Sequence, residues 1–145
     1  MTKSAVPEGY HTLTPYFFVK DPEVFLAFLK AAFDGEVTEC MRGEDGQVQH
    51  AEVRVGDSML MLSPAKGEYP PMPASVYMYV ADADTTYQRA LDAGGVSLME
   101  PADMFYGDRN AGVRDPLGNL WWMATRKENV PSDELARRAK THMKH

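Results

Sequence analysis

Apolar and polar positions alternate along the chain with two different periods. The run at 10–19, YHTLTPYFFV, is rich in aromatic and β-branched residues and predicts a strand. Asp21 and Pro22 then supply a helix N-cap and first position, and apolar residues recur at helical spacing, so a helix is predicted over 22–34. Turn signals separate three further predicted strands, at about 36–42, 47–55 and 58–63.

The same order of elements returns after a proline-rich stretch. Residues 64–74 hold four of the ten prolines and predict a linker. One strand, one helix and three strands are then predicted, at about 75–80, 83–93, 96–100, 109–114 and 119–125. VKD at 19–21 aligns with VAD at 80–82, and AEVR at 51–54 aligns with AGVR at 111–114, at an offset of 60 or 61 residues. Matched order at a nearly constant offset indicates an internal duplication.

The duplication predicts the fold class. We expect an α+β protein of two tandem βαβββ modules, about 10–63 and 75–126, within one domain spanning 1–145. Each helix covers one face of its sheet, so the two modules should form a curved, cup-shaped mixed sheet with the helices outside. A further helix is predicted at about 132–141, with Ser132 as its N-cap.

Composition and charge exclude several classes of protein. A net charge of −6 argues against binding to nucleic acid, and no apolar run approaches the roughly 20 residues of a membrane span. The N-terminus lacks the apolar core of a signal peptide, and Cys40 stands alone, so we expect a cytoplasmic protein with an inert cysteine. Ten methionines and fifteen aromatic residues suit either a packed core or an adaptable apolar pocket.

Several motifs resemble one family. DPLGN at 115–119 resembles the "DP-x-G" turn before the last strand of the glyoxalase/bleomycin-resistance/extradiol dioxygenase, or vicinal-oxygen-chelate, superfamily. TPYFFVKD, HAEVRVGDSMLML and FYGDRNAGVRDPLGNLWWMATR resemble its PhnB-like branch. The resemblance covers residues 10 to about 138. It implies the duplicated βαβββ fold, and it implies a homodimer because members commonly pair two chains.

The resemblance also implies four metal-ligand positions, which fall here on Thr14, Met61, Ser75 and Trp122. Divalent cations are held by imidazole, carboxylate, thiolate or carbonyl groups, and this set offers none of these side chains. A shift of one residue in the alignment restores no ligand set. We therefore expect neither a metal nor another cofactor, and neither glyoxalase I nor ring-cleaving dioxygenase activity.

Strand alternation predicts which side chains line the cup. The opposite positions, such as Leu60, Leu62, Ala51 and Val53, are apolar and suit the helix side. The predicted ligand-binding residues are Thr14, Tyr16, Phe18, His50, Met59, Met61, Ser75, Tyr77, Arg109 and Trp122. The rings either form a pocket wall or simply fill a small cup.

Polar residues of the cup allow two interpretations. His50 and Glu52 lie two positions apart on one strand face, as a general base beside a carboxylate or, with Arg54, as a salt-bridge row. No catalytic residue is assigned, and His50 and Glu52 are the candidates. Arg109 either anchors an anionic ligand group or pairs with Asp108 to hold its loop.

These features favour a metal-independent small-molecule binding protein of the bleomycin-resistance type. It would hold an aromatic or partly apolar organic ligand in the cup, and we expect it to act as a homodimer. One alternative is a metal-independent lyase or isomerase acting on a small carbonyl compound, with His50, Glu52, Tyr16 or Arg109 as acid, base or anchor. Another is a stress or regulatory module whose pocket is vestigial. The residues leave open whether a reaction is catalysed.

Overall fold

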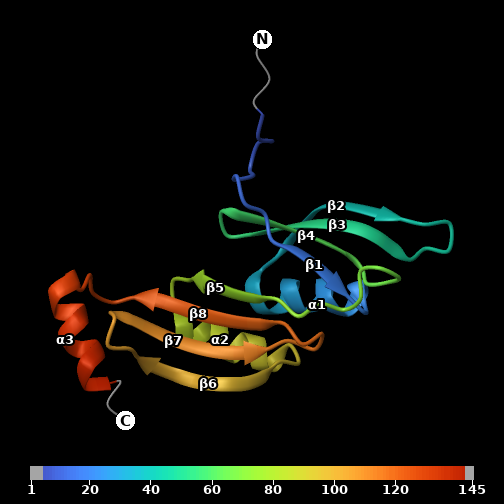
Figure 1. Ribbon diagram of the computed structural model, residues 1–145. Helices are drawn as coiled ribbons and strands as arrows, with labels where there is room; N and C mark the ends of the chain where they lie inside the picture. Colours follow the sequence, from blue (N-terminus) through green and yellow to red (C-terminus); the bar gives the residue numbers. More distant parts are fainter. Residues whose placement is uncertain (1–4, 143–145) are drawn as a thin grey trace.

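Two four-stranded mixed sheets form the body of the protein in the computed structural model, which describes residues 5–142 (Figure 1). The first sheet contains β1 (Tyr16–Val19), β2 (Glu36–Arg42), β3 (Val48–Val55) and β4 (Ser58–Pro64), in the order β1-β4-β3-β2. The second contains β5 (Ser75–Tyr79), β6 (Val96–Asp103), β7 (Asp108–Arg114) and β8 (Leu120–Arg126), in the order β5-β8-β7-β6. In each sheet the first strand runs parallel to the fourth and the other pairs are antiparallel. The repeated topology confirms the predicted duplication of a βαβββ module.

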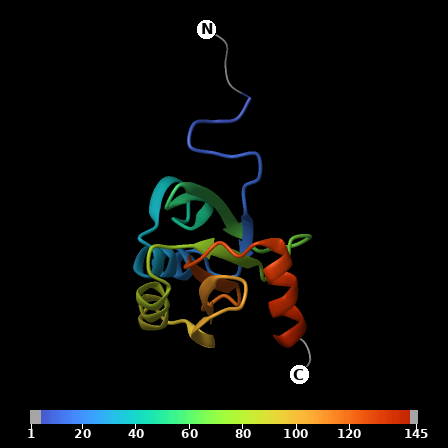
Figure 2. The same cartoon turned by 90° about the vertical axis from the view of Figure 1, so that its left-hand side faces the viewer.

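Helices α1 (Pro22–Phe33) and α2 (Ala83–Asp92) lie on the same side of the two sheets (Figure 2). Each begins after an aspartate that caps its first turn: Asp21 accepts from the Val24 amide at 3.2 Å, and Asp82 accepts from the Asp84 amide at 3.0 Å. Helix α3 (Ser132–His142) lies on the other side, at one end of the second sheet. The faces of the two sheets opposite α1 and α2 therefore share one side of the molecule. None of the helices in the described part of the chain is long and apolar enough to cross a membrane.

The first strand is shorter than its sequence predicts. Residues 10–15 stay outside the sheet, and β1 begins only at Tyr16. The Pro15 carbonyl accepts a hydrogen bond from the Met61 amide at 2.9 Å, but proline has no N–H to extend the pairing. Leu13 consequently remains 86% exposed.

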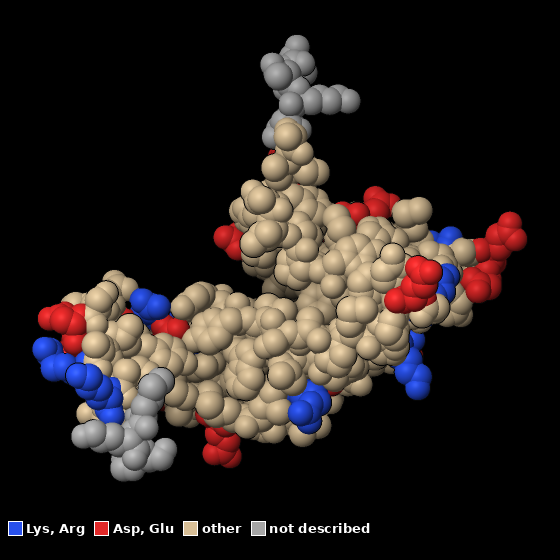
Figure 3. Space-filling view, in the orientation of Figure 1, with Lys and Arg blue, Asp and Glu red and all other residues tan. Residues whose placement is uncertain are grey.

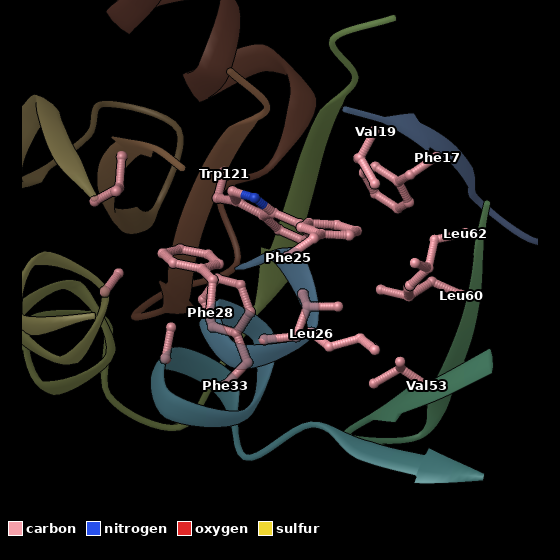
Figure 4. Close-up of a cluster of buried hydrophobic side chains, with 14 of the residues drawn as sticks. Phe17, Val19, Phe25, Leu26, Phe28, Phe33, Val53, Leu60, Leu62 and Trp121 are labelled. Atoms are coloured by element: carbon pink, nitrogen blue, oxygen red, sulfur yellow. The ribbon is translucent and has the colours of Figure 1, made fainter. Parts of the chain in front are cut away.

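Side chains from both modules share one hydrophobic core (Figure 4). Trp121 of β8 packs against Phe17 of β1 and Phe33 of α1, with ring centroids 5.7 and 4.9 Å apart, and lies near Phe25 of α1. Ala51, Val53, Leu60 and Leu62 are buried on the helix side, as alternation predicts. The indole of the second module thus fills part of the hydrophobic core of the first module.

The DPLGN turn holds this indole in place. Asp115 is 3% exposed and accepts from the amides of Leu117 and Asn119, from the Asn119 side chain and from Trp121 Nε1, all within 2.8–3.0 Å. Asn119 Oδ1 in turn accepts from the Ala74 amide at 2.9 Å and so fixes the end of the linker before β5. The motif therefore has a structural role in this chain.

Candidate functional site

The face of each sheet opposite α1 and α2 is termed here its cup face. On the first sheet, Tyr16, Met61 and Glu52 stand in register on three neighbouring strands. Side chains in register share a face, so these three lie on the cup face of the first module. Tyr16 is 42% exposed and Met61 is half-buried. The structure thus brings together predicted ligand-binding residues from β1 and β4.

A chain of hydrogen bonds crosses this cup face. The hydroxyl of Tyr16 lies 3.3 Å from His50 Nδ1, and His50 Nε2 lies 2.9 Å from Glu52 Oε2. The side chains of His50 and Glu52 are 24% and 22% exposed. Arg54 pairs instead with Glu36, at 3.5 Å, so the proposed salt-bridge row of His50, Glu52 and Arg54 does not form.

Aromatic rings extend the same surface away from His50. The Phe18 ring lies 5.1 Å from Tyr16, at an interplanar angle of 37°. Its other neighbour is Tyr69 of the linker, which stacks on it at 5.1 Å and 11°. An antiparallel bridge between Phe18 and Met72 ties the linker to the outer edge of β1. Tyr69 therefore belongs to this surface, although sequence alternation pointed only to strand residues.

On the second sheet, Tyr77, Trp122 and Gly112 stand in register on β5, β8 and β7. Trp122 Nε1 donates to Ser75 Oγ at 3.0 Å. A Cβ atom at Gly112 would lie only 2.4 Å from the indole, so the Trp122 ring lies directly on the backbone of β7. The glycine lets the indole lie flat in the cup face of the second module.

A buried carboxylate organises the tyrosines beside this indole. Asp108, 2% exposed, accepts from Tyr77 and Tyr79 at 2.7 and 3.0 Å and from Arg126 Nε at 2.6 Å. Burial alone would raise the pKa of Asp108, but these three hydrogen bonds outweigh it and lower the pKa below its usual value. Burial and the bond to Asp108 raise the pKa of Tyr77. The sequence did not reveal that Asp108 holds these tyrosines, although alternation along β7 puts Asp108 on the same face as Gly112.

Arg109 lies on the opposite face of β7. Its guanidinium binds both carboxylate oxygens of Asp84, at 2.6 and 3.0 Å, and one oxygen of Asp103 at 3.2 Å. The predicted pair with Asp108 is therefore wrong, because Asp108 pairs with Arg126. The partners of Arg109 come instead from α2 and the end of β6. Two carboxylates therefore compensate its charge on the face of β7 that lies away from the cup.

The four positions that the family resemblance assigns to metal ligands do not fit a divalent cation. Trp122 and Ser75 are hydrogen-bonded to each other, and an indole N–H is a donor without a lone pair to offer. Thr14 and Met61 supply only a hydroxyl and a thioether. Within residues 5–142 no group of three or more His, Cys, Asp and Glu side chains could hold a metal ion.

A cleft of about 930 Å³ separates the two modules (Figure 3). Its walls come from the segment before β1, the β3–β4 turn, the end of α1, strand β5 and α2. Of the predicted ligand-binding residues, Met59 and Tyr77 line it. Figure 3 also shows a surface without charged side chains over the middle of β5 and β8, with charged side chains at the α3 end of β8. The charged residues that line the cleft are Asp34, Asp57 and Arg89, and Arg89 is paired with Asp34.

The two cup faces remain separate within the chain. In the described residues, no hydrogen bond or ring contact joins the Tyr16 side chain to Tyr77 or Trp122. Tyr16, Phe18, His50 and Met61 form one cluster, and Ser75, Tyr77 and Trp122 form another. Thr14, half-buried, precedes β1.

Two duplicated βαβββ modules with a shared core and solvent-facing cups define a protein of the vicinal-oxygen-chelate class. A scan against family models matches residues 10–123 to the Glyoxalase/Bleomycin resistance protein/Dioxygenase superfamily, and the chain belongs to this family. Uncharacterized proteins from Mycobacterium bovis and Mycobacterium tuberculosis are 30% identical over 137 residues, which cover 85% of this chain and 88% and 79% of theirs.

Solved structures share the fold. TioX from Micromonospora sp. ML1 superposes with a TM-score of 0.71 at 21% identity, covering 80% of this chain and 98% of TioX. TnmS3, described as an antibiotic binding protein from Streptomyces sp. CB03234, has a TM-score of 0.64 at 21% identity, with 88% and 99% covered. The PhnB protein from Bacillus cereus has a TM-score of 0.64 at 19% identity, with 79% and 99% covered. At these identities the likeness describes the fold.

Proposed function

We propose that the protein binds an aromatic or partly apolar small molecule on its cup faces, in the manner of a bleomycin-resistance protein. The observation that carries this proposal is the exposure of aromatic rings on the cup faces and on the linker beside them. Tyr16, Tyr77 and Tyr79 are 42%, 42% and 59% exposed, and Tyr69 of the linker is 55% exposed. Rings presented in this way offer stacking area at little entropic cost.

The polar groups beside these rings support binding more than chemistry. Asp108 is saturated by Tyr77, Tyr79 and Arg126, and Trp122 is fixed by Ser75. These bonds hold the rings still, so a ligand meets a surface that is already organised. The antibiotic binding described for TnmS3, whose fold is shared, is consistent with such a role.

Thermal denaturation with planar aromatic probes tests the proposal. We expect 2-naphthol, quinoline or anthraquinone to raise the melting temperature, because a ligand that binds only the folded chain stabilises it. Trp122→Ala should weaken the affinity about tenfold, since it removes a stacking ring from the second cup face.

Val24→Ala is the matched control. Val24 is an exposed apolar residue on α1, on the far side of the sheets, and its loss should leave the ligand-induced shift unchanged. A panel that produces no shift in the wild-type chain would argue against binding on the cup faces. Equal shifts in the wild-type and Trp122→Ala chains would argue against binding on the second cup face.

The proposal includes a homodimer. Tyr16, Tyr77, Tyr79, Met41 and Met72 leave a broad apolar surface exposed in the single chain. Apolar patches of this kind mark interaction sites in soluble proteins, and a second copy could close the two separate cup faces around a ligand. We expect light scattering after gel filtration to give the mass of two chains at micromolar concentration. A mass of one chain, unchanged by ligand, would contradict the dimer.

One observation favours a metal-independent lyase or isomerase as a second candidate. The Tyr16–His50–Glu52 chain places a histidine between a carboxylate and a phenol, an arrangement that can move a proton. Turnover of a small carbonyl compound that is abolished by His50→Ala would favour this enzyme over a pure binder. Binding without turnover favours the first candidate.

A further inference from the structure

The Tyr16–His50–Glu52 chain has a defined direction. An ionised carboxylate only accepts hydrogen bonds, so the 2.9 Å contact with Glu52 requires the proton of the imidazole to lie on His50 Nε2. In the neutral imidazole, Nδ1 is then an acceptor. The only hydrogen available for the 3.3 Å contact at Nδ1 is the hydroxyl proton of Tyr16. Tyr16 therefore donates to His50, and His50 donates to Glu52.

This direction determines what Tyr16 can offer to a ligand. Its single O–H is used by His50, whereas its oxygen lone pairs receive no donor from the described residues. Tyr16 is 42% exposed on the cup face. Toward a ligand, the hydroxyl of Tyr16 is a hydrogen-bond acceptor and not a donor.

The surroundings of Tyr16 specify the rest of the ligand. Phe18 lies 5.1 Å from the Tyr16 ring and stacks with Tyr69, which provides a strip of aromatic surface. Met61, in register with Tyr16, adds an adaptable apolar contact. A planar ring lying on this strip would bring its edge to the Tyr16 oxygen.

We propose that the first cup face selects aromatic ligands that carry a hydrogen-bond donor, a phenolic O–H or an aryl N–H, received by the Tyr16 oxygen. His50 and Glu52 act as positioning residues, which hold the Tyr16 proton away from the ligand. The inference rests on the proposed binding function and adds the chemical class of the ligand. It disfavours ethers and other groups that only accept hydrogen bonds, because their oxygen would face the Tyr16 lone pairs.

Three probes of similar shape test the inference by calorimetry with the full chain: 2-naphthol, 2-methoxynaphthalene and naphthalene. We use about pH 8, above the range in which histidine side chains ordinarily titrate. 2-Naphthol should bind about five- to tenfold more tightly than naphthalene, the gain expected for one net hydrogen bond. 2-Methoxynaphthalene should bind no better than naphthalene.

Two variants separate the roles of Tyr16 and His50. Tyr16→Phe keeps the ring but removes the acceptor, so naphthalene should bind as before and the advantage of 2-naphthol should disappear. His50→Phe removes the acceptor of the Tyr16 proton, so the freed O–H should donate to the ether and tighten the binding of 2-methoxynaphthalene. A merely structural role of His50 would weaken all three probes alike.

The outcomes distinguish this inference from the function on which it rests. Equal affinity of the wild-type chain for 2-naphthol and naphthalene would overturn the donor selection while leaving aromatic binding intact. Persistence of the 2-naphthol advantage in Tyr16→Phe would overturn it as well. Failure of all three probes to bind would overturn both proposals. Circular dichroism of each variant, matched to the wild-type spectrum, establishes that the comparison concerns folded protein.

Discussion

Trp121→Ala is expected to lower the free energy of unfolding by about 3–5 kcal/mol, the range measured for truncating large buried aromatic side chains. Trp121 is 2% exposed and contacts the rings of Phe17, Phe25 and Phe33. These three rings belong to the first module and the indole to the second. The substitution would therefore leave a cavity at the junction of the modules and weaken their association as well as the local packing.

Urea denaturation followed by circular dichroism measures this loss, and the neighbouring tryptophan supplies the control. Trp122 lies on the cup face, only partly buried, and Trp122→Ala should cost well under half as much stability. The two substitutions should therefore have different effects. Trp121→Ala should lower the stability of the fold, and Trp122→Ala should mainly weaken ligand binding. Similar losses of stability in both variants would contradict the assignment of Trp121 to the core.

Asp115→Ala should cost about 3 kcal/mol, because it leaves buried donors without partners. The carboxylate accepts four hydrogen bonds, including those from Trp121 Nε1 and the side chain of Asn119, which is 1% exposed. Asp115→Asn should fall between the wild type and the alanine variant. Its remaining oxygen can serve the two backbone amides, whereas its NH₂ group cannot accept from Trp121.

Equilibrium unfolding in urea checks this order, with Glu44→Ala as the control on an exposed turn, where changes stay within about 0.5 kcal/mol. Removing Trp121 Nε1 by Trp121→Phe should reduce the cost of Asp115→Ala, because directly contacting residues are not additive. Full additivity of the two substitutions would show that the turn does not stabilise the protein through the indole.

Some elements could be predicted accurately from the sequence, and others could not. Asp21 and Asp82 mark the starts of α1 and α2, because a cap acts on amides two or three residues away and needs no distant partner. The start of β1 was predicted six residues too early, because a strand exists only where a neighbour pairs with it. Apolar character at 10–15 predicted a strand, but Pro15 has no N–H, and residues 10–15 do not pair with the start of β4, which begins at Ser58.

In the candidate site, too, the sequence predicted some contacts and missed others. Alternation placed His50 and Glu52 on one strand face, and they are indeed hydrogen-bonded. The contact of Tyr16 with His50 spans 34 residues, and that of Asp108 with Tyr77 spans 31. Such contacts depend on strand order and register, which local patterns do not encode. For the same reason local patterns did not reveal the partners of Arg109, because Asp84 and Asp103 are brought to it by α2 and β6.

The sequence by itself determined the duplicated module, the side of each strand that enters the core and the absence of ligand-type side chains at the four family positions. Each of these follows from a local period or from side-chain chemistry at a given place. Only the tertiary structure decided which carboxylate pairs with which arginine, that Trp121 joins the two modules, and that the hydroxyl of Tyr16 lies beside His50. These depend on contacts between distant segments, whose geometry exists only after the sheets have formed.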